Sequence, residues 1–343
     1  PVGALNAAPS HMRGRTWELE EVKYISPHDC VGSNMNLHIL DNSIFRVVPH
    51  ENKKINETWI SDRDRFSYEA IEHKDRVKKP IAKINGRHIE VEWEQAFEII
   101  KNKMADIDPG STAGFISAGS TVEEQYLFQK WLRENNIFNI DHRVSQSNFD
   151  YEEDDIFPKI DIPIKDIENC KSILLIDSNV TYEQPILSHK IRKAFLKESK
   201  INSIHTYSYK NNFNLNNSLL INPNNFSETL IDIIEYLSVI TVNDKTLKKF
   251  TIPETIKNKF KGLTNTNIIE ITNDLLLKNS IIFLGSNLKN HPDFQLLKIL
   301  TNIISIYTKS NTCYLGEKSN EAGAWLTGCL PKRCEGLADA KHQ

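Results

Sequence analysis

The chain has 343 residues, of which 39% are hydrophobic and 25% are charged, a composition typical of soluble globular proteins. Lys and Arg number 42 against 45 acidic residues, giving a formal net charge of −3. This balance argues against a dedicated nucleic-acid or anionic-membrane binder, and no apolar run approaches the ~20 residues that span a bilayer. Five cysteines without a C-x-x-C pair argue against a disulfide framework. A start at Pro1, without methionine or signal-peptide features, predicts a fragment of a longer protein.

The first part of the chain predicts short antiparallel strands. Two apolar-alternating runs, 35–40 and 44–49, flank the turn residues 41–43 and predict a hairpin. A second hairpin is predicted within 81–93, where Asn85-Gly86 is a strong turn signal. From Trp93 onward the apolar spacing changes to threes and fours, which predicts a helix.

The remainder of the chain alternates apolar strands with amphipathic helices. This alternation predicts a parallel sheet that is covered on both faces, so a small antiparallel β unit precedes a doubly wound α/β domain. A capping box is expected at Thr121 and Glu124, and Pro185 is expected to open a helix. The predicted buried strands are 112–119, 172–179, 201–208 and 280–287, and the predicted helices are 121–135, 185–199, 226–239, 253–262, 268–278 and 292–306.

Two segments, 173–185 and 281–292, share an apolar strand, a Ser-Asn pair at its carboxyl end and a proline before the next helix. Such loops can meet an anionic ligand, or the Ser and Asn side chains can simply cap the following helices. The sequence has no G-x-G-x-x-G, no Walker loop, no G-x-S-x-G and no H-E-x-x-H motif. The scattered histidines and cysteines predict structural roles rather than a metal centre.

Longer stretches carry a family resemblance. "VGSNMNLHI", "INETWISDRDRFSYE", "KPIAKINGRHIEVEWEQAFEII", "ILLIDSNVTYEQPILSHKIRKAF" and "SNEAGAWLTGCLP" resemble, in order, the large iron–sulfur subunit of bacterial proton-pumping NADH–quinone oxidoreductase, respiratory complex I. The body of that family is similar to molybdopterin oxidoreductases of the formate dehydrogenase type. The resemblance implies a division into the tail of an upstream iron–sulfur domain (1–14), a small β domain that has lost its cluster (15–75) and an α/β domain (76–343).

The resemblance also implies cofactors and partners. One 2Fe–2S and two 4Fe–4S clusters would lie upstream of this fragment, which would itself hold no cluster and no molybdenum. The expected partners are other peripheral-arm subunits, including the NADH-binding flavoprotein and iron–sulfur subunits, at the cytoplasmic side of the bacterial inner membrane without insertion into it. No catalytic residue is expected within the chain.

The molybdenum relatives carry an extra four-iron cluster with the spacing C-x2-C-x3-C-x27-C. Aligning that pattern on this chain places the ligand positions at Ser26, Asp29, Ser33 and Ser61. Because none is cysteine and thiolates are the usual ligands, the resemblance implies a vacated cluster site. Cys30 lies one residue out of register and is expected to be a bystander.

Two other functions fit the sequence less well. A molybdopterin-dependent oxidoreductase, such as a formate dehydrogenase or nitrate reductase, would need that cluster, and Asp177 stands where pterin-binding relatives tend to have glycine. A stand-alone nucleotide-binding module would need a phosphate loop, which the sequence lacks. We expect the aromatic and arginine-rich segment Arg63, Arg65, Phe66 and Tyr68 to form a packing interface with the upstream cluster domain.

Overall fold

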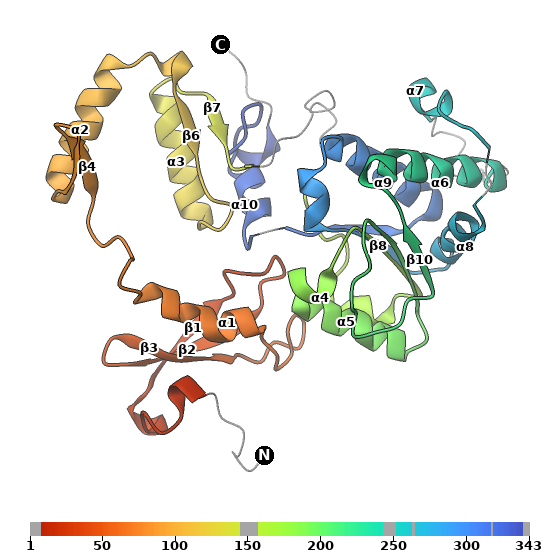
Figure 1. The fold of residues 1–343 in the computed structure, drawn as a ribbon, viewed down its shortest axis with the longest axis horizontal. Coiled ribbons are helices and arrows are strands. Elements are labelled where there is room, and N and C mark those ends of the chain that lie inside the picture. Colours follow the sequence, from red (N-terminus) through yellow and green to blue (C-terminus); the bar gives the residue numbers. More distant parts are fainter. Residues whose placement is uncertain (1–7, 145–156, 243–251, 263–264, 317, 339–343) are drawn as a thin grey trace.

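A computed structural model describes residues 8–144, 157–242, 252–262, 265–316 and 318–338 (Figure 1). Pro1 and the rest of the predicted upstream tail to residue 7 lie outside these ranges. Figure 1 shows three parts: a small β sheet in red and orange, a lobe built around α3, and a larger α/β domain in green to blue. No helix within the described ranges is both long and apolar enough to cross a membrane.

The small sheet is antiparallel, with strand order β1-β2-β3. The predicted hairpin is confirmed as β2 and β3, and its turn residues Asp41 and Asn42 both have positive φ, a backbone conformation that Asp and Asn tolerate. The elements of this part are η1 (Ala8–Ser10), η2 (Thr16–Glu18), β1 (Glu20–Ile25), β2 (Asn34–Leu40), β3 (Ser43–Pro49), α1 (Asp62–Phe66) and η3 (Ser67–Ile71).

The second predicted hairpin is confirmed as β4 (Ile81–Ile84) and β5 (Arg87–Glu90), joined by Asn85 and Gly86 at φ 50° and 79°. Both residues need a positive φ in this tight turn, which is why Asn-Gly is favoured there. The helix predicted from Trp93 is α2 (Trp93–Asp106), which has no buried residue.

The lobe differs from the prediction, which placed all later strands in one sheet. Its elements are η4 (Pro109–Ser111), β6 (Ala113–Phe115), α3 (Val122–Glu134), β7 (Asn139–Asp141), α10 (Glu321–Leu326) and η9 (Glu335–Leu337). Strands β6 and β7 form a separate two-stranded parallel sheet. The predicted buried strand 112–119 is wrong in length and burial, because β6 has three residues and Phe115 is 68% exposed.

The packing of α3 explains the lobe. A Cβ at Gly114 would lie 2.2 Å from Leu132 Cδ1, so a larger residue there would force the Leu132 side chain to move. The predicted capping box is confirmed, with Thr121 and Glu124 each donating a backbone N–H to the other's side chain at 2.9 and 3.2 Å. Leu132, Ile140 and Ala324 of α10 then share one hydrophobic cluster.

The α/β domain contains a five-stranded parallel sheet of order β10-β9-β8-β11-β12, which confirms the predicted doubly wound class. In β8, Leu174 and Ile176 pack toward α6, α8 and α9, whereas Ile173 and Leu175 pack toward α5. Each such fully buried side chain contributes roughly 1.5–3 kcal/mol. The strands are β8 (Ser172–Ile176), β9 (Lys200–His205), β10 (Asn217–Leu220), β11 (Ser280–Leu284) and β12 (Asn311–Tyr314).

The helices of this domain begin and end partly where predicted. They are η6 (Ile164–Asn169), α4 (Val180–Glu183), α5 (Pro185–Leu196), η7 (Pro223–Asn225), α6 (Phe226–Ile240), α7 (Glu254–Lys257), α8 (Thr266–Leu275), η8 (Ser286–Asn290) and α9 (Phe294–Thr308). Pro185 opens α5 as expected. The predicted helix 253–262 shrinks to the one turn of α7, and α8 ends at Leu275 rather than at 278.

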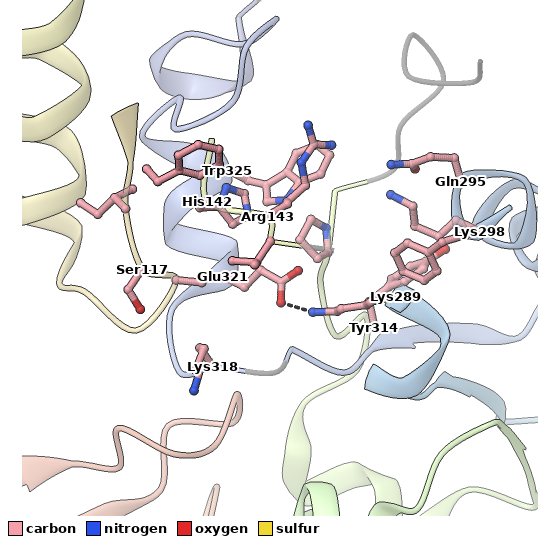
Figure 2. Close-up of a pocket in the computed structure, with 16 residues that line it drawn as sticks. Ser117, His142, Arg143, Lys289, Gln295, Lys298, Tyr314, Lys318, Glu321 and Trp325 are labelled. Carbon is pink, nitrogen blue, oxygen red and sulfur yellow. Dashed lines mark hydrogen bonds and ion pairs between the residues drawn. The ribbon is translucent and has the colours of Figure 1, made fainter. Parts of the chain in front are cut away.

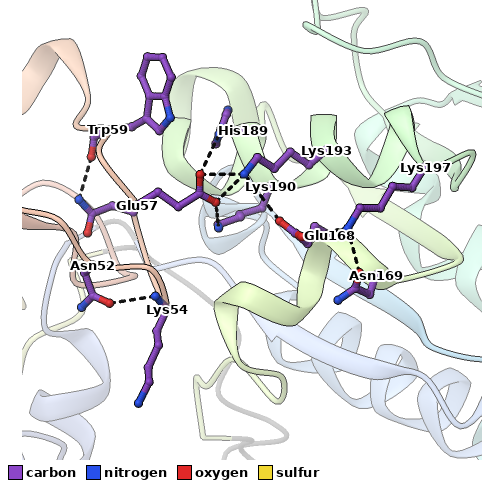
Figure 3. A network of polar contacts seen from close by, with 11 residues as sticks. Asn52, Lys54, Glu57, Trp59, Glu168, Asn169, His189, Lys190, Lys193 and Lys197 are labelled. Atoms are coloured by element: carbon purple, nitrogen blue, oxygen red, sulfur yellow. Dashed lines mark hydrogen bonds and ion pairs between the residues drawn. The ribbon is translucent and has the colours of Figure 1, made fainter.

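A polar cluster joins the small β sheet to the α/β domain (Figure 3). The Glu57 carboxylate accepts hydrogen bonds from Lys190 and Lys193 of α5 at 2.5 and 2.6 Å. These bonds hold the pKa of Glu57 down at about 2. Lys190 is only 1% exposed, so it depends on Glu57 for charge compensation.

Candidate functional site

The four predicted ligand positions lie together in the small β domain, and all are buried. Ser26 directly follows β1 and Ser33 directly precedes β2, with Asp29 in the turn between them. Ser61 directly precedes α1. Their exposed fractions are 1%, 0%, 2% and 6% respectively. The Ser26 N–H donates to the Ser33 carbonyl at 2.8 Å, which links the two ends of the turn.

One further carboxylate, Asp64, connects these positions. Ser26 Oγ donates to Asp64 Oδ1 at 2.6 Å, and Ser61 Oγ donates to Asp64 Oδ2 at 2.8 Å. In return, the Asp64 N–H donates to Ser61 Oγ at 3.1 Å, which makes Ser61 the N-cap of α1. The sequence reasoning missed Asp64, although a serine three residues before an acidic residue is a helix-start signal.

Asp29 organises the turn itself. Its Oδ1 accepts the N–H groups of Val31, Gly32 and Ser33 at 3.2, 2.9 and 3.3 Å, and its Oδ2 accepts the Ser33 hydroxyl. Burial raises the pKa of Asp29, the bonds from Ser33 oppose that shift, and the nearby charge of Asp64 adds to it. The oxygen atoms at these positions are therefore already engaged with protein donors and acceptors.

Cys30 lies outside this network and packs toward the α/β domain. Its N–H donates to Gln184 Oε1 at 3.2 Å. Gly316 lies so close that a Cβ added to it would be 3.1 Å from the Cys30 Cβ. It packs with Val31 against the hydrophobic cluster beneath α5. Burial raises the pKa of the Cys30 thiol to about 12, so it stays protonated and is a poor metal ligand.

The arginine-rich segment makes contacts within the chain. Arg63 Nη2 donates to the Glu183 carbonyl at 2.6 Å, and the Tyr68 hydroxyl donates to the Phe45 carbonyl at 3.2 Å. Phe66 is 40% exposed. Arg63, one residue of the predicted interface, therefore contacts α4 of the same chain.

The carboxyl edge of the parallel sheet carries the two Ser-Asn loops. Glu183 of α4 accepts the N–H of Asn179 at 2.7 Å and the N–H of Ser286 at 3.0 Å, so one carboxylate caps both loops. Burial raises the pKa of Glu183, while the bonds from these N–H groups lower it. Neither Ser178 nor Asn179 caps α4 with its side chain, contrary to one of the two predicted roles.

The loops also touch each other directly. The Gly285 N–H donates to the Ile176 carbonyl at 2.9 Å, and a Cβ at Gly285 would lie 2.1 Å from the Asp177 carbonyl oxygen. Asp177 Oδ1 accepts the N–H and hydroxyl of Thr206 at 3.2 and 3.0 Å. In α/β sheets, ligands bind between the loops at the carboxyl ends of adjacent strands. Here the loops after β8 and β11 contact each other through their backbones, and the carboxylates of Asp177 and Glu183 bind their neighbouring N–H groups.

A cavity of about 330 Å³ lies between the lobe and the α/β domain (Figure 2). Figure 2 shows Lys289 paired with Glu321 across it. Trp325 comes from α10, and Gln295 and Lys298 come from α9. Within the described part of the chain, no group of three or more His, Cys, Asp or Glu side chains is arranged to hold a metal ion.

Comparison with known proteins defines the class. Residues 76–314 match the molybdopterin oxidoreductase family, and residues 19–69 match the 4Fe–4S domain of NADH-ubiquinone oxidoreductase NDSU1/NuoG-like proteins. Acetylene hydratase from Pelobacter acetylenicus shares the fold, with a TM-score of 0.54 at 12% identity over 82% of this chain and 43% of that one. The chain belongs to the molybdopterin oxidoreductase family.

The relatives found by sequence are large subunits of NADH–quinone oxidoreductase, the family that the sequence resemblance indicated. The NADH-ubiquinone oxidoreductase 75 kDa subunit of Reclinomonas americana is 32% identical over 248 residues, which are 68% of this chain and 35% of the relative. The matching NADH-quinone oxidoreductase subunit of Rickettsia bellii is 31% identical over 217 residues, 61% of this chain and 31% of the relative. The chain spans about a third of the length of these relatives.

The residues present do not fit the groups that these families imply. Residues 19–69 contain a single cysteine, Cys30, whereas a four-iron cluster requires several thiolates. At the sheet edge, the N–H groups that would receive a pyrophosphate already bind Glu183, and Asp177 adds a second negative charge. At both places the side chains are engaged with protein partners.

Proposed function

We propose that this chain is a non-redox part of the large iron–sulfur subunit of a proton-translocating NADH–quinone oxidoreductase. The observation that carries the proposal is the match of residues 19–69 to a 4Fe–4S domain. The positions that we propose as its former ligand positions, Ser26, Asp29, Ser33 and Ser61, hold hydrogen-bonded oxygen side chains in place of cysteine. The similarity to relatives that are NADH-quinone oxidoreductase subunits supports it. The segment braces its neighbours and contributes no catalytic residue.

In this proposal the redox groups belong to other parts of the protein. One 2Fe–2S and two 4Fe–4S clusters elsewhere in the subunit pass electrons from NADH toward quinone. The partners are the NADH-binding flavoprotein and the iron–sulfur subunits of the peripheral arm, at the cytoplasmic side of the bacterial inner membrane. We divide the chain into the end of the upstream domain (1–14), the small β domain (15–75) and the α/β domain (76–343).

We also propose that the chain holds no molybdenum and no pterin. The closed sheet edge supports this, because a dinucleotide would have to displace the Glu183 carboxylate and approach Asp177. The lack of cysteine at the four proposed ligand positions supports it too, since without a cluster there electrons would have no relay to the pterin. A molybdopterin-dependent reaction, such as that of a formate dehydrogenase, is disfavoured on both grounds.

Metal content tests the proposal. Residues 1–343 would be purified without oxygen, and iron, molybdenum and tungsten would be measured by mass spectrometry. We expect none of the three in stoichiometric amount. Stoichiometric molybdenum or tungsten would overturn the scaffold proposal, and stoichiometric iron would mean that the ligands have been placed wrongly.

A gain of metal tests the ligand positions directly. The quadruple variant Ser26→Cys, Asp29→Cys, Ser33→Cys and Ser61→Cys is expected to bind about four irons per chain after reconstitution with iron and sulfide. The triple variant that keeps Ser61 is the matched control and should bind less. A folded quadruple variant, judged by circular dichroism, that takes up no iron would contradict the alignment.

Cys30→Ala tests the bystander role. Because Cys30 lies outside the network, iron uptake by the quadruple variant should be unchanged when Cys30→Ala is added. The packing loss beneath α5 should lower the free energy of unfolding by roughly 1 kcal/mol in urea titration. A drop in bound iron would show that Cys30 is a ligand after all.

A further inference from the structure

Helix α2 carries an exposed apolar side. Figure 1 shows the helix at the edge of the molecule, on the far side of α3 from the α/β domain. Its side chains Trp93, Phe97 and Ile100 are 59%, 60% and 47% exposed, and none of its residues is buried. In the part of the chain that the structure describes, every other α-helix of ten or more residues buries three or more of its own. Because an amphipathic helix is stabilised by the surface that covers its apolar side, α2 is suited to contact another molecule.

The apolar residues of α2 have the spacing of a helix–helix seam. Trp93, Phe97, Ile100 and Met104 are four, three and four residues apart, as the a and d positions of a coiled coil are. The Trp93 and Phe97 ring centres lie 5.7 Å apart with 33° between the ring planes, so the two rings form one aromatic surface. Met104, toward the other end of the helix, packs against the hydrophobic cluster of the lobe. The exposed part of this seam fits a second helix.

Two charged residues beside the seam indicate which helix fits. Glu94 follows Trp93 and Lys101 follows Ile100, so both charges lie on the same flank of the seam, seven residues apart. Both residues are exposed. Neither forms an ion pair with a described residue.

A second copy of α2 supplies the complementary charges when the two helices run antiparallel. In that arrangement Phe97 of each copy packs against Ile100 of the other, as a and d positions do across antiparallel helices. Glu94 of each copy then lies beside Lys101 of the other. The two-fold axis repeats this contact, so one interface contains two such ion pairs and α2 is complementary to itself.

We propose that two copies of this chain associate through their antiparallel α2 helices. The exposed parts of the two aromatic side chains amount to roughly 500 Å² over two copies. This is less than the ~1,200 Å² at which stable interfaces begin, so the dimer is weak and reversible. The inference goes beyond the proposed respiratory role and does not depend on it, because no residue of α2 belongs to the serine and aspartate network.

Sedimentation equilibrium of the full chain, residues 1–343, tests the association. Over protein concentrations from about 5 to 500 μM, the average mass should rise from that of a monomer toward that of a dimer, with a dissociation constant on the order of 10–100 μM. Added salt should weaken the dimer, because it screens the exposed Glu94 and Lys101 pairs.

A substitution in the seam assigns the dimer to α2. Phe97→Asp should weaken association at least about tenfold, because it places a charge in the centre of the interface. Leu196→Asp is the matched control: Leu196 is 64% exposed at the end of α5, outside α2, and the variant should dimerise normally. Circular dichroism checks that both variants fold. If Phe97→Asp does not fold, Ile100→Asp takes its place.

Charge reversal tests the antiparallel arrangement. Glu94→Lys alone should weaken the dimer, since it places like charges together twice, and Lys101→Glu alone should do the same. The double variant, with both reversals, restores opposite charges and should dimerise as the wild type does. These two exposed positions make no contribution to the core, so the four chains differ only in the pairing of charges.

Three results would overturn the proposal. A folded wild-type chain that remains monomeric at about 500 μM would leave the apolar side of α2 to a different protein. A dimer that is unchanged in the folded Phe97 or Ile100 variant would place the interface elsewhere. A double charge reversal that stays as weak as the single ones would exclude the antiparallel arrangement.

Discussion

At the scale of single residues, His205 stands out because both of its ring nitrogens are buried without a hydrogen-bond partner in the described structure. It lies at the end of β9, 1% exposed, with its ring edge-on to Tyr209 at 4.7 Å. Burial lowers the pKa of His205 to about 4, and the charge of Asp177 opposes the shift. The folded chain therefore requires the neutral imidazole.

This makes His205 a source of acid sensitivity. The unfolded chain binds the proton near pH 6.5 and the folded chain only near pH 4, so stability falls as the pH drops between these values, by up to about 3 kcal/mol. His205→Phe keeps a ring against Tyr209 and should remove that fall. Urea denaturation from pH 7 to pH 4 measures it, with the exposed His88→Phe as control. An unchanged pH slope would assign the sensitivity to another group.

The serine and aspartate network shows what could be predicted at residue scale. The positions Ser26, Asp29, Ser33 and Ser61 were implied by the family resemblance, and the structure buries all four. Asp64 was missed because its bond to Ser26 spans 38 residues of sequence. Glu183 was missed for the same reason, since its bond to Ser286 spans 103 residues and no local sequence pattern predicts that contact.

At the scale of elements, α5 holds the small β sheet through Glu57. The folded pKa of Glu57, about 2, lies below its ordinary 4.5, so its contribution is complete above pH 4.5 and is lost as the pH falls toward 2. The Glu57 side chain is 26% exposed, so solvent reduces the stability that its ion pair contributes, whereas Lys190 is almost fully buried.

Glu57→Gln should therefore destabilise the contact between these elements. Leaving Lys190 buried beside a neutral amide should cost roughly 2–4 kcal/mol at pH 7. Hydrogen exchange should speed up in β1 to β3 and in α5 more than in β11. Glu92→Gln is the matched control, because Glu92 pairs with Lys79, which is 52% exposed, and the change should leave the free energy of unfolding nearly unchanged. Equal effects of the two changes would refute the special role of Glu57.

Element prediction succeeded where local chemistry decides the structure. Adjacent residues specify the hairpin turn at Asn85-Gly86, the cap at Thr121 and the fully buried strand β8, in which four apolar residues follow Ser172. It failed for β10 and β12, whose polar composition gives no strand signal and whose pairing comes from neighbouring strands. It also failed for the separation of β6 and β7 from the main sheet, because the apolar spacing of a strand does not specify its partner.

At the scale of the whole molecule, the lobe is completed by the far end of the chain. The Arg133 guanidinium of α3 donates to the carbonyls of Gly328, Leu330 and Arg333 at 3.1, 3.2 and 2.7 Å. Gln125 and Gln129 are buried at 0% and 2% exposure, and Gln125 lies beneath the start of α10. The polar side chains of α3 thus bind the backbone of the segment 320–333.

Arg133→Met should loosen that segment without affecting the main sheet. Losing the charged hydrogen bonds should cost roughly 2 kcal/mol locally, so proteolysis after α10 should be about 30-fold faster. Lys130→Met is the control, because Lys130 forms an exposed pair with Glu134 at 3.9 Å, on the surface of the same helix. Unchanged cleavage in Arg133→Met would mean that other contacts fix α10.

The return of α10 to α3 also orders events during synthesis. Asn320 contacts Gln125 across 195 residues, which a ribosome adds in about 10–40 s. For most of that interval β6, α3 and β7 have been synthesised but lack their closing helix. The parallel sheet has all its strands before α10 is made, so the lobe is the last part to mature and the part that chaperones have the longest time to meet.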